Sequence, residues 1–164
     1  MPSQCAPSEF RVEKQRASGV LTLSSGRSEQ GYFFTAAGSA RHDGPELVGE
    51  LLNSEAGFFP FEIHDTDRVG TALFHRGHVV LVELADNEAS RDPGYGVAAR
   101  RVVSVLLSSG RRLVGAVRVY APEGRDRLSD WARLPGTFRY LETAETTFIV
   151  NTTHIVEVSE VAAP

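Results

Sequence analysis

Two histidines occupy matching places in the chain and are the first candidates for chemistry. His78 stands in the stretch Arg76-Gly-His-Val-Val-Leu-Val82, and His154 stands in Thr152-Thr-His-Ile-Val-Glu-Val158. Each precedes an apolar run typical of a strand, so each is expected at the turn that opens that strand. An imidazole beside Arg76 or the two threonines would suit contact with an anion or a nucleic acid. The alternative is a partly buried histidine at the end of the fold, and the sequence favours this second interpretation.

Arginines in the second half of the chain form another candidate surface. Residues 98–164 carry 9 arginines against 7 acidic residues, whereas residues 1–97 carry 8 basic and 14 acidic residues. The candidate contacts for RNA or a protein partner are therefore Arg76, His78, Arg111, Arg112, Arg118 and His154. Because the whole chain has a net charge of −4, strong non-specific binding to nucleic acid is not expected. The alternative interpretation is that these arginines form ion pairs with the acidic first half of the chain, which would explain the excess of arginine without a partner.

The residues give little support to an enzyme. His75 and His78, with His64, Asp65 and Asp67 upstream, resemble a metal cluster only in composition. Asp65 and Asp67 suit a turn between strands. No nucleophile elbow or phosphate-binding glycine loop is present, and Lys14 is the only lysine. We therefore predict no catalytic residues, no cofactor and no metal.

Composition limits the class of protein further. The chain has 164 residues, of which 41% are hydrophobic and 23% charged, as in a folded globular protein. A single cysteine, Cys5, excludes an internal disulfide. No apolar run is long enough to span a membrane, and the first residues lack the pattern of a signal peptide. A cytoplasmic protein without membrane contact is expected.

An internal repeat organises these residues. Leu21-Thr-Leu-Ser-Ser-Gly-Arg27 matches Val105-Leu-Leu-Ser-Ser-Gly-Arg111, and Thr71–Val82 matches Thr147–Val158. Two shorter blocks between them also align, and the offset shrinks only from 84 to 76 residues. Four matching blocks in the same order indicate a duplicated domain.

Each copy is expected to be a short, strongly bent sheet of five strands. Ser-Ser-Gly-Arg is typical of a tight hairpin, because glycine adopts the positive φ that the turn needs. Gly31 and Gly115 fall inside the second strands, where glycine marks a bend. Leu128 and Trp131 share one face of a short helix that Pro135-Gly136 ends.

These patterns resemble the Sm/Hfq family of small SH3-like barrels. Val105–Gly115, and more weakly Leu21–Gly31, resemble the start of the first Sm motif, and Phe74–Val82 resembles the second. Thr153-His154-Ile155 is similar to the turn whose basic residue and histidine contact RNA in Hfq-type proteins. Arg127-Leu-Ser-Asp130 also resembles an uncharacterised bacterial domain family. The Sm loop whose asparagine reads a base is absent, so the resemblance implies the barrel more than RNA binding.

The sequence thus predicts a mostly-β protein of two tandem five-stranded Sm-like barrels, each with a short helix between strands two and three. The predicted parts are a flexible N-terminus (1–9), the first barrel (10–85), a linker (86–97) and the second barrel (98–162). The expected function is a non-enzymatic assembly or protein-interaction module that binds a protein partner, or itself, through edge strands. The alternative is a regulatory RNA-binding protein, and DNA is not expected.

Overall fold

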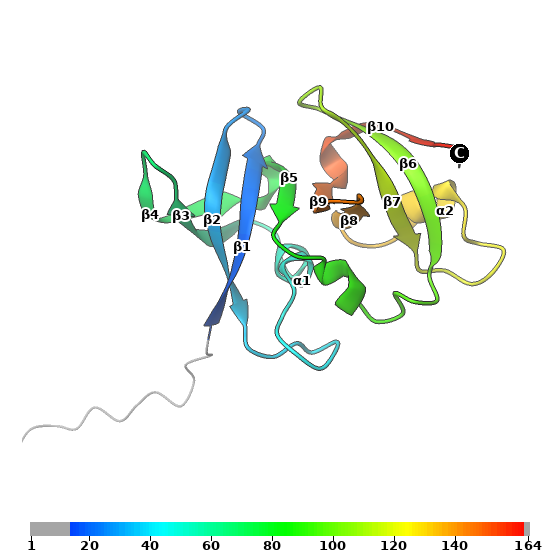
Figure 1. The fold of residues 1–164 in the computed structure, drawn as a ribbon, viewed down its shortest axis with the longest axis horizontal. Helices are drawn as coiled ribbons and strands as arrows, with labels where there is room; N and C mark the ends of the chain where they lie inside the picture. Colours follow the sequence, from blue (N-terminus) through cyan, green and yellow to red (C-terminus); the bar gives the residue numbers. More distant parts are fainter. Residues whose placement is uncertain (1–13, 163–164) are drawn as a thin grey trace, which may run out of the picture.

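The computed structural model describes residues 14–162, which form one antiparallel sheet of ten strands (Figure 1). The predicted flexible segment 1–9 lies outside the described residues. The strands are β1 (Lys14–Leu23), β2 (Ser28–Ala36), β3 (Phe58–His64), β4 (Val69–His75), β5 (Val79–Leu84), β6 (Ala99–Leu107), β7 (Arg112–Val119), β8 (Phe138–Glu142), β9 (Thr147–Asn151) and β10 (Ile155–Glu160). The helices are α1 (Val48–Asn53) and α2 (Leu128–Arg133), with short 3-10 helices η1 (Arg76–His78), η2 (Glu88–Arg91) and η3 (Thr152–His154).

The two halves of the chain follow the same strand order. Across the sheet the order is β10-β6-β7-β8-β9-β5-β1-β2-β3-β4, so the fifth strand of each half lies beside its first strand. Strand β5 of the first half pairs with strand β9 of the second half, and this pairing joins the halves. Strands β4 and β10 are left as the two outer strands of the sheet.

The mostly-β class predicted from the sequence is confirmed, but two separate barrels are not found. The sheet is continuous, and its two buried cores share strands across the junction. Val80 and Leu81 of β5 pack in the core of the second half, while Ile149 of β9 packs in the core of the first half. Val79 and Val82 of β5 pack in the first core, and Val150 of β9 packs in the second, so β5 and β9 each supply both cores. The repeat in the sequence could not reveal this exchange.

Two interior glycines allow neighbouring strands to approach closely. A Cβ atom on Gly115 would lie 2.7 Å from the carbonyl oxygen of Glu142, and one on Gly31 would overlap the carbonyl oxygen of Glu62. The glycines predicted to bend the second strands are therefore needed for contact with β3 and β8. At the two hairpins, Gly26 and Gly110 have φ values of 87° and 88°, as the Ser-Ser-Gly-Arg pattern predicts.

A buried carboxylate fixes the connection between the halves. Glu88 of η2 is 5% exposed and accepts hydrogen bonds from the backbone N–H groups of Val48 and Gly49, at 3.0 Å each. It also accepts a hydrogen bond of 2.9 Å from the Tyr140 hydroxyl. Burial raises the pKa of Glu88 above its ordinary value. Glu88 thus ties η2 both to α1 in the first half and to β8 in the second.

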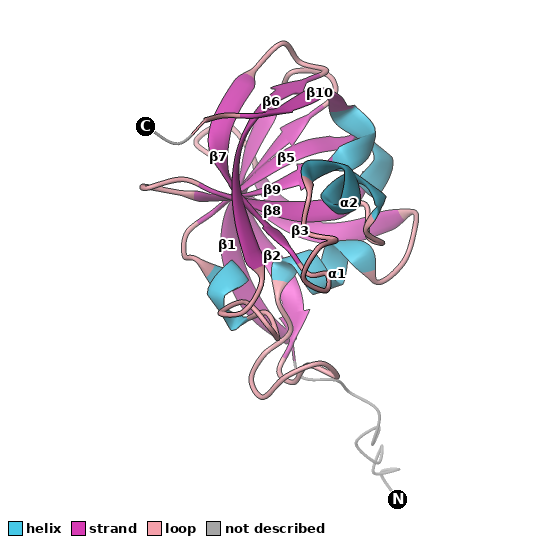
Figure 2. Cartoon of the chain, turned by 90° about the vertical axis from the view of Figure 1, so that its right-hand side faces the viewer, coloured by secondary structure: helices cyan, strands magenta, loops and turns pink. Residues whose placement is uncertain are grey.

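Helices α1 and α2 both lie on the right-hand side of the molecule in Figure 2. The predicted helix around Trp131 is present, and Trp131 is buried in the second core. Among the described residues, no helix has the length and hydropathy that crossing a membrane requires.

Candidate assembly interface

The junction between β5 and β9 is a seam made of backbone pairing and buried side chains. Its antiparallel pairs are Leu81 with Val150, Val82 with Ile149, Glu83 with Phe148 and Leu84 with Thr147. Val82 and Ile149 are both fully buried, at 0% exposure. The fourth strand of the second half therefore contacts the fifth strand of the first half through buried apolar side chains.

Two asparagines reinforce the seam with hydrogen bonds from one half to the other. The Nδ2 atom of Asn151 donates to the carbonyl oxygen of Val79 at 2.9 Å, and Asn151 is 1% exposed. The side chain of Asn53 in α1 bonds both backbone groups of Phe138: Nδ2 donates to the carbonyl at 2.8 Å, and Oδ1 accepts from the N–H at 2.9 Å. These bonds satisfy backbone groups that would otherwise be buried without a partner.

The two histidines singled out from the sequence occupy equivalent places at one end of this seam. The Nδ1 atom of His78 lies 2.8 Å from the hydroxyl of Ser24, and that of His154 lies 2.9 Å from the hydroxyl of Ser108. The Nε2 atom of His154 also donates to the carbonyl oxygen of Gly77 at 2.7 Å, across the seam. Within residues 14–162, Nε2 of His78 has no hydrogen-bond partner. The two histidines therefore share the hydrogen bond to a serine, and His154 alone also bonds the other half.

The outer strands β4 and β10 expose apolar side chains whose counterparts at the seam are buried. Leu73 on β4 is 67% exposed, and Val156 on β10 is 66% exposed. By the repeat in the sequence, Leu73 corresponds to Ile149 and Val156 corresponds to Val80, both of which are fully buried. The two free edges thus keep part of the apolar pattern of the seam, although Glu157 and Glu160 of β10 stand where β5 has the buried Leu81 and Leu84.

Strand β4 lacks the usual protection of an edge strand. Its residues, Val69–His75, include no lysine, arginine, proline or acidic residue. Edge strands are normally protected by charges, prolines or bulges, because their free N–H and C=O groups can pair with another strand. Phe58 on the adjoining strand β3 is also 61% exposed. This edge is therefore a surface suited to a further strand.

The predicted contact Arg76 is buried rather than available to a ligand. Its guanidinium donates to the carbonyl oxygens of Phe58 at 2.8 Å and of Leu51 at 3.1 Å, and its residue exposure is 4%. Burial lowers the pKa of Arg76. These contacts give Arg76 a structural role beneath the turn that carries His78.

The three predicted arginines of the second half do not form one surface. Arg111 lies over the ring of Phe148 at 5.4 Å, and Arg112 donates to the Ser104 hydroxyl at 2.9 Å. Arg118 is at the other end of β7, roughly 20 Å away along the strand. There it bonds the carboxylate of Glu142 at 3.3 Å and the hydroxyl of Tyr95 at 3.0 Å.

Asp65 and Asp67, the acidic residues considered for metal binding, lie in the turn between β3 and β4. Oδ1 of Asp65 accepts a hydrogen bond from the N–H of Thr66 at 2.7 Å, in the connection between β3 and β4. Within the part of the chain that the structure describes, no group of three or more His, Cys, Asp or Glu residues is placed to hold a metal ion.

Sequence reasoning missed the residues that define the seam and its free counterparts. Asn53 and Asn151 lie at ordinary polar positions in the sequence, and only the pairing of distant strands gives them their roles. Leu73 carried a usable signal, because it is a large apolar residue that aligns with Ile149 in the sequence match between Thr71–Val82 and Thr147–Val158.

Comparisons with protein families, with curated proteins and with solved structures found no match. The function must therefore be inferred from the geometry of this chain.

Proposed function

We propose that this chain is a self-assembling module made by duplication of an Sm-like unit. In the assembly, β4 of one copy pairs with β10 of the next copy, as β9 pairs with β5 inside the chain. The internal seam is the observation that carries the proposal, because it provides a template of the same strand positions. The common strand order of the halves supports the duplication, and the closely approached glycines Gly31 and Gly115 inside the second strands support the likeness to Sm barrels.

The repeat gives the register of the proposed junction. A shift of 76 residues converts the seam pairs into Phe74 with Glu157, Leu73 with Val158, and Ala72 with Ser159. In this register Leu73 enters the second core of the neighbouring copy, as Ile149 enters the first core within the chain. Burying a leucine side chain contributes about 1.5–3 kcal/mol, which favours association.

The same shift supplies a partner for the free nitrogen of His78. Gly77, which accepts the hydrogen bond from His154, corresponds to Thr153 in the second copy. Across the proposed junction, Nε2 of His78 would therefore donate to the carbonyl oxygen of Thr153 in the neighbouring copy. The alternative interpretation of the histidines, as structural residues at the end of the fold, agrees with this role.

The junction joins two different edges, so it is heterologous and propagates from copy to copy. Such contacts produce a closed ring when the rotation between copies closes, and an open fibre when it does not. We expect a ring, in which each chain contributes two five-stranded units. The negative first half and positive second half favour this head-to-tail order.

Light scattering after gel filtration tests the proposal through the mass in solution. The expected mass is a multiple of 17.8 kDa that ribonuclease does not change. Leu73→Asp should return the mass to one chain. Val114→Asp, at a 54% exposed position inside the sheet, is the control and should leave the assembly intact. A parent protein that stays at 17.8 kDa at every concentration would refute the proposal.

RNA is a second candidate partner because three histidines gather at one end of the seam. The rings of His75 and His78 lie 5.8 Å apart, and His154 bonds the intervening Gly77. Anisotropy of a labelled single-stranded RNA pool at low and physiological salt tests this function. Binding that weakens steeply with salt and falls in His78→Ala and His154→Ala would support it, whereas no binding at either salt would exclude it.

A further inference from the structure

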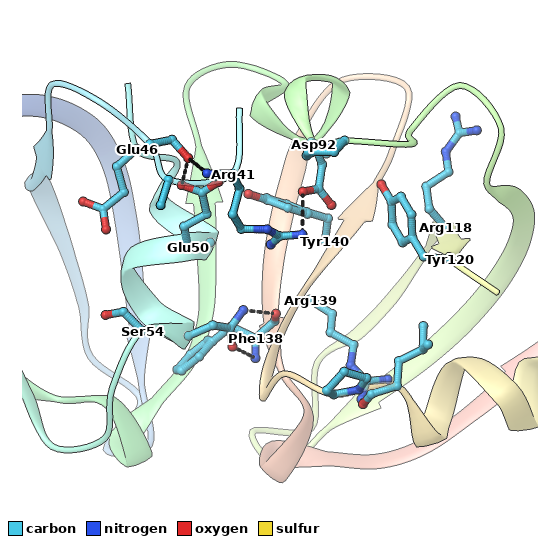
Figure 3. A pocket seen from close by; sticks show the side chains of 18 of the residues that line it. Arg41, Glu46, Glu50, Ser54, Asp92, Arg118, Tyr120, Phe138, Arg139 and Tyr140 are labelled. Carbon is cyan, nitrogen blue, oxygen red and sulfur yellow. Dashed lines mark hydrogen bonds and ion pairs between the residues drawn. The ribbon is translucent and has the colours of Figure 1, made fainter. Parts of the chain in front are cut away.

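A cavity lies between the two halves, on the side that carries α1 and α2 (Figure 3). Its walls come from α1 and the loop before it, η2 and the residues after it, the end of β7, α2 and β8. The cavity volume is about 810 Å³. Sites for small organic molecules typically measure about 300–1,000 Å³, so this cavity has the size of a ligand site.

Aromatic side chains supply much of the wall. Trp131 and Phe138 are each 5% exposed, and Tyr120 and Tyr140 line the cavity as well. The Tyr140 hydroxyl already donates to Glu88. Flat apolar surfaces of this kind suit a ligand with a ring system.

Three charged groups of the wall are engaged with partners inside the chain. Arg41 lies 3.7 Å from Asp92, across the upper part of Figure 3, and Arg118 pairs with Glu142. Glu50 accepts a hydrogen bond from the Ser39 hydroxyl and lies 3.0 Å from Nε2 of His42. The two arginines therefore need no ligand to balance their charge.

Arg139 is the exception among the cations of the wall. Its guanidinium donates to the carbonyl oxygens of Trp131, Leu134 and Gly136, and it lies 4.9 Å from the centre of the Trp131 ring. No carboxylate of residues 14–162 lies within 4.0 Å of it. A guanidinium has five N–H donors, so two remain after these three bonds. Burial lowers the pKa of Arg139, which is the cost of a cation without an anionic partner.

Glu46, an acidic residue of the cavity wall without a basic partner among the described residues, lies away from Arg139. One carboxylate oxygen of Glu46 accepts a hydrogen bond of 2.8 Å from the N–H of Ala36. In Figure 3 the Glu46 side chain points away from the cavity, toward the opposite side from Arg139. An anion beside Arg139 would thus meet an uncompensated positive charge next to an aromatic surface.

We propose that this cavity binds a small amphipathic molecule with a flat apolar body and a single anionic group. The body packs against Trp131 and Phe138, and the anionic group accepts hydrogen bonds from Arg139. The site is contained within one chain, so its occupancy does not depend on the self-assembly proposed above.

Two fluorescent probes that differ by one charge test this proposal. One probe is 8-anilinonaphthalene-1-sulfonate, and the other is N-phenyl-1-naphthylamine, which has the same rings without the sulfonate. Trp131 is the only tryptophan, so energy transfer from tryptophan to a probe reports that the probe is bound to the chain, and the variants below locate the binding. We expect the sulfonate to bind with transfer and at least about tenfold more tightly than the neutral probe.

Matched variants locate the binding. Arg139→Met should weaken the sulfonate about tenfold and leave the neutral probe unchanged, whereas Arg133→Met, at an exposed position on α2, should change neither. Because Arg139→Met also removes bonds at the end of α2, Ala40→Phe provides a second variant. Ala40 is exposed and lines the cavity, and the larger side chain should weaken both probes. Absence of transfer, equal affinity for both probes, or no effect of Ala40→Phe would overturn the proposal.

Discussion

The seam at β5 and β9 and the free edges at β4 and β10 present the same strand positions in two environments. Ile149 and Val80 at the seam are 0% exposed, while their counterparts Leu73 and Val156 are 67% and 66% exposed. The turns beside them keep the same hydrogen bonds to Ser24 and Ser108. The edge side chains are exposed because β4 and β10 each have a neighbouring strand on one side only.

The seam and the free edge also differ in their polar contacts. Asn151 and His75 each accept a hydrogen bond from the backbone N–H two residues later, at 3.0 Å in both cases. Only Asn151 reaches across to the other half, at the carbonyl of Val79. The seam thus combines apolar burial with satisfied polar groups, as a permanent interface does.

The largest expected difference comes from one charge placed at the two equivalent strand positions. Ile149→Asp buries a carboxylate in the shared core and should reduce the free energy of unfolding by about 4 kcal/mol or more. Leu73→Asp exposes its carboxylate to water and should change the unfolding free energy of the single chain by less than about 1 kcal/mol. Urea unfolding of both variants measures the difference, and similar losses would contradict the contrast between seam and edge.

A smaller loss of unfolding free energy than for Ile149→Asp is expected from a substitution at Gly115 in the second half. Gly115→Val places a side chain against the carbonyl oxygen of Glu142 and should reduce the unfolding free energy by roughly 1–3 kcal/mol. Thermal melting measures the loss. Gly96→Val is the control, because a Cβ there meets nothing within 4 Å. Equal melting of the parent and Gly115→Val would show that β7 and β8 do not need the glycine.

Removing a polar side chain should also reduce the unfolding free energy more at the seam than at the matching position of the free edge. Asn151→Ala removes the hydrogen bond to Val79 in a buried place and should cost about 1–3 kcal/mol. His75→Ala, at the matching exposed place, should cost less than about 0.5 kcal/mol. The two unfolding midpoints compare them, and an equal cost would mean that Asn151 adds nothing to the seam.

The smallest effect is a pH dependence that arises from Glu88. Its pKa is raised in the folded protein, so the folded state holds a proton that the unfolded chain has released between the ordinary and raised pKa. This contribution to stability is present at low pH and is lost as pH rises through the raised pKa. Glu88→Gln cannot titrate, so the melting temperature of the variant relative to the parent should increase from pH 4.5 to pH 7.5. Glu83→Gln, at an exposed position on β5, is the control, and a pH-independent difference for Glu88→Gln would contradict the prediction.

The sequence was most informative where local chemistry decides structure. Gly26 and Gly110 identified the hairpins, and the apolar runs that include Val79–Leu84 and Ile155–Val158 identified strands. It could not show the exchange of Val80 and Ile149 between the two cores, because that contact depends on which distant strands pair. The sequence therefore predicted two barrels, whereas the structure has one continuous sheet.

The candidate site was predictable only in part. His78 and His154 were singled out because they recur, but the bond from His154 to Gly77 spans 77 residues and has no local signal. Arg76 looked exposed in a turn, yet it is buried because its guanidinium satisfies carbonyls of the chain before β4. Charge alone could not distinguish a binding arginine from a structural one.

Disulfide trapping tests the proposed junction most directly. In a Cys5→Ser background, Ala72→Cys and Ser159→Cys place one thiol on each free edge, in the register of Glu83 and Phe148 at the seam. Directly opposed residues of an antiparallel pair lie close enough for a disulfide. Leu73→Cys with Ser159→Cys, one residue out of register, is the control. The account predicts covalent multiples of 17.8 kDa for the first pair and far fewer for the control. Single chains only, or equal cross-linking by both pairs, would contradict the head-to-tail junction.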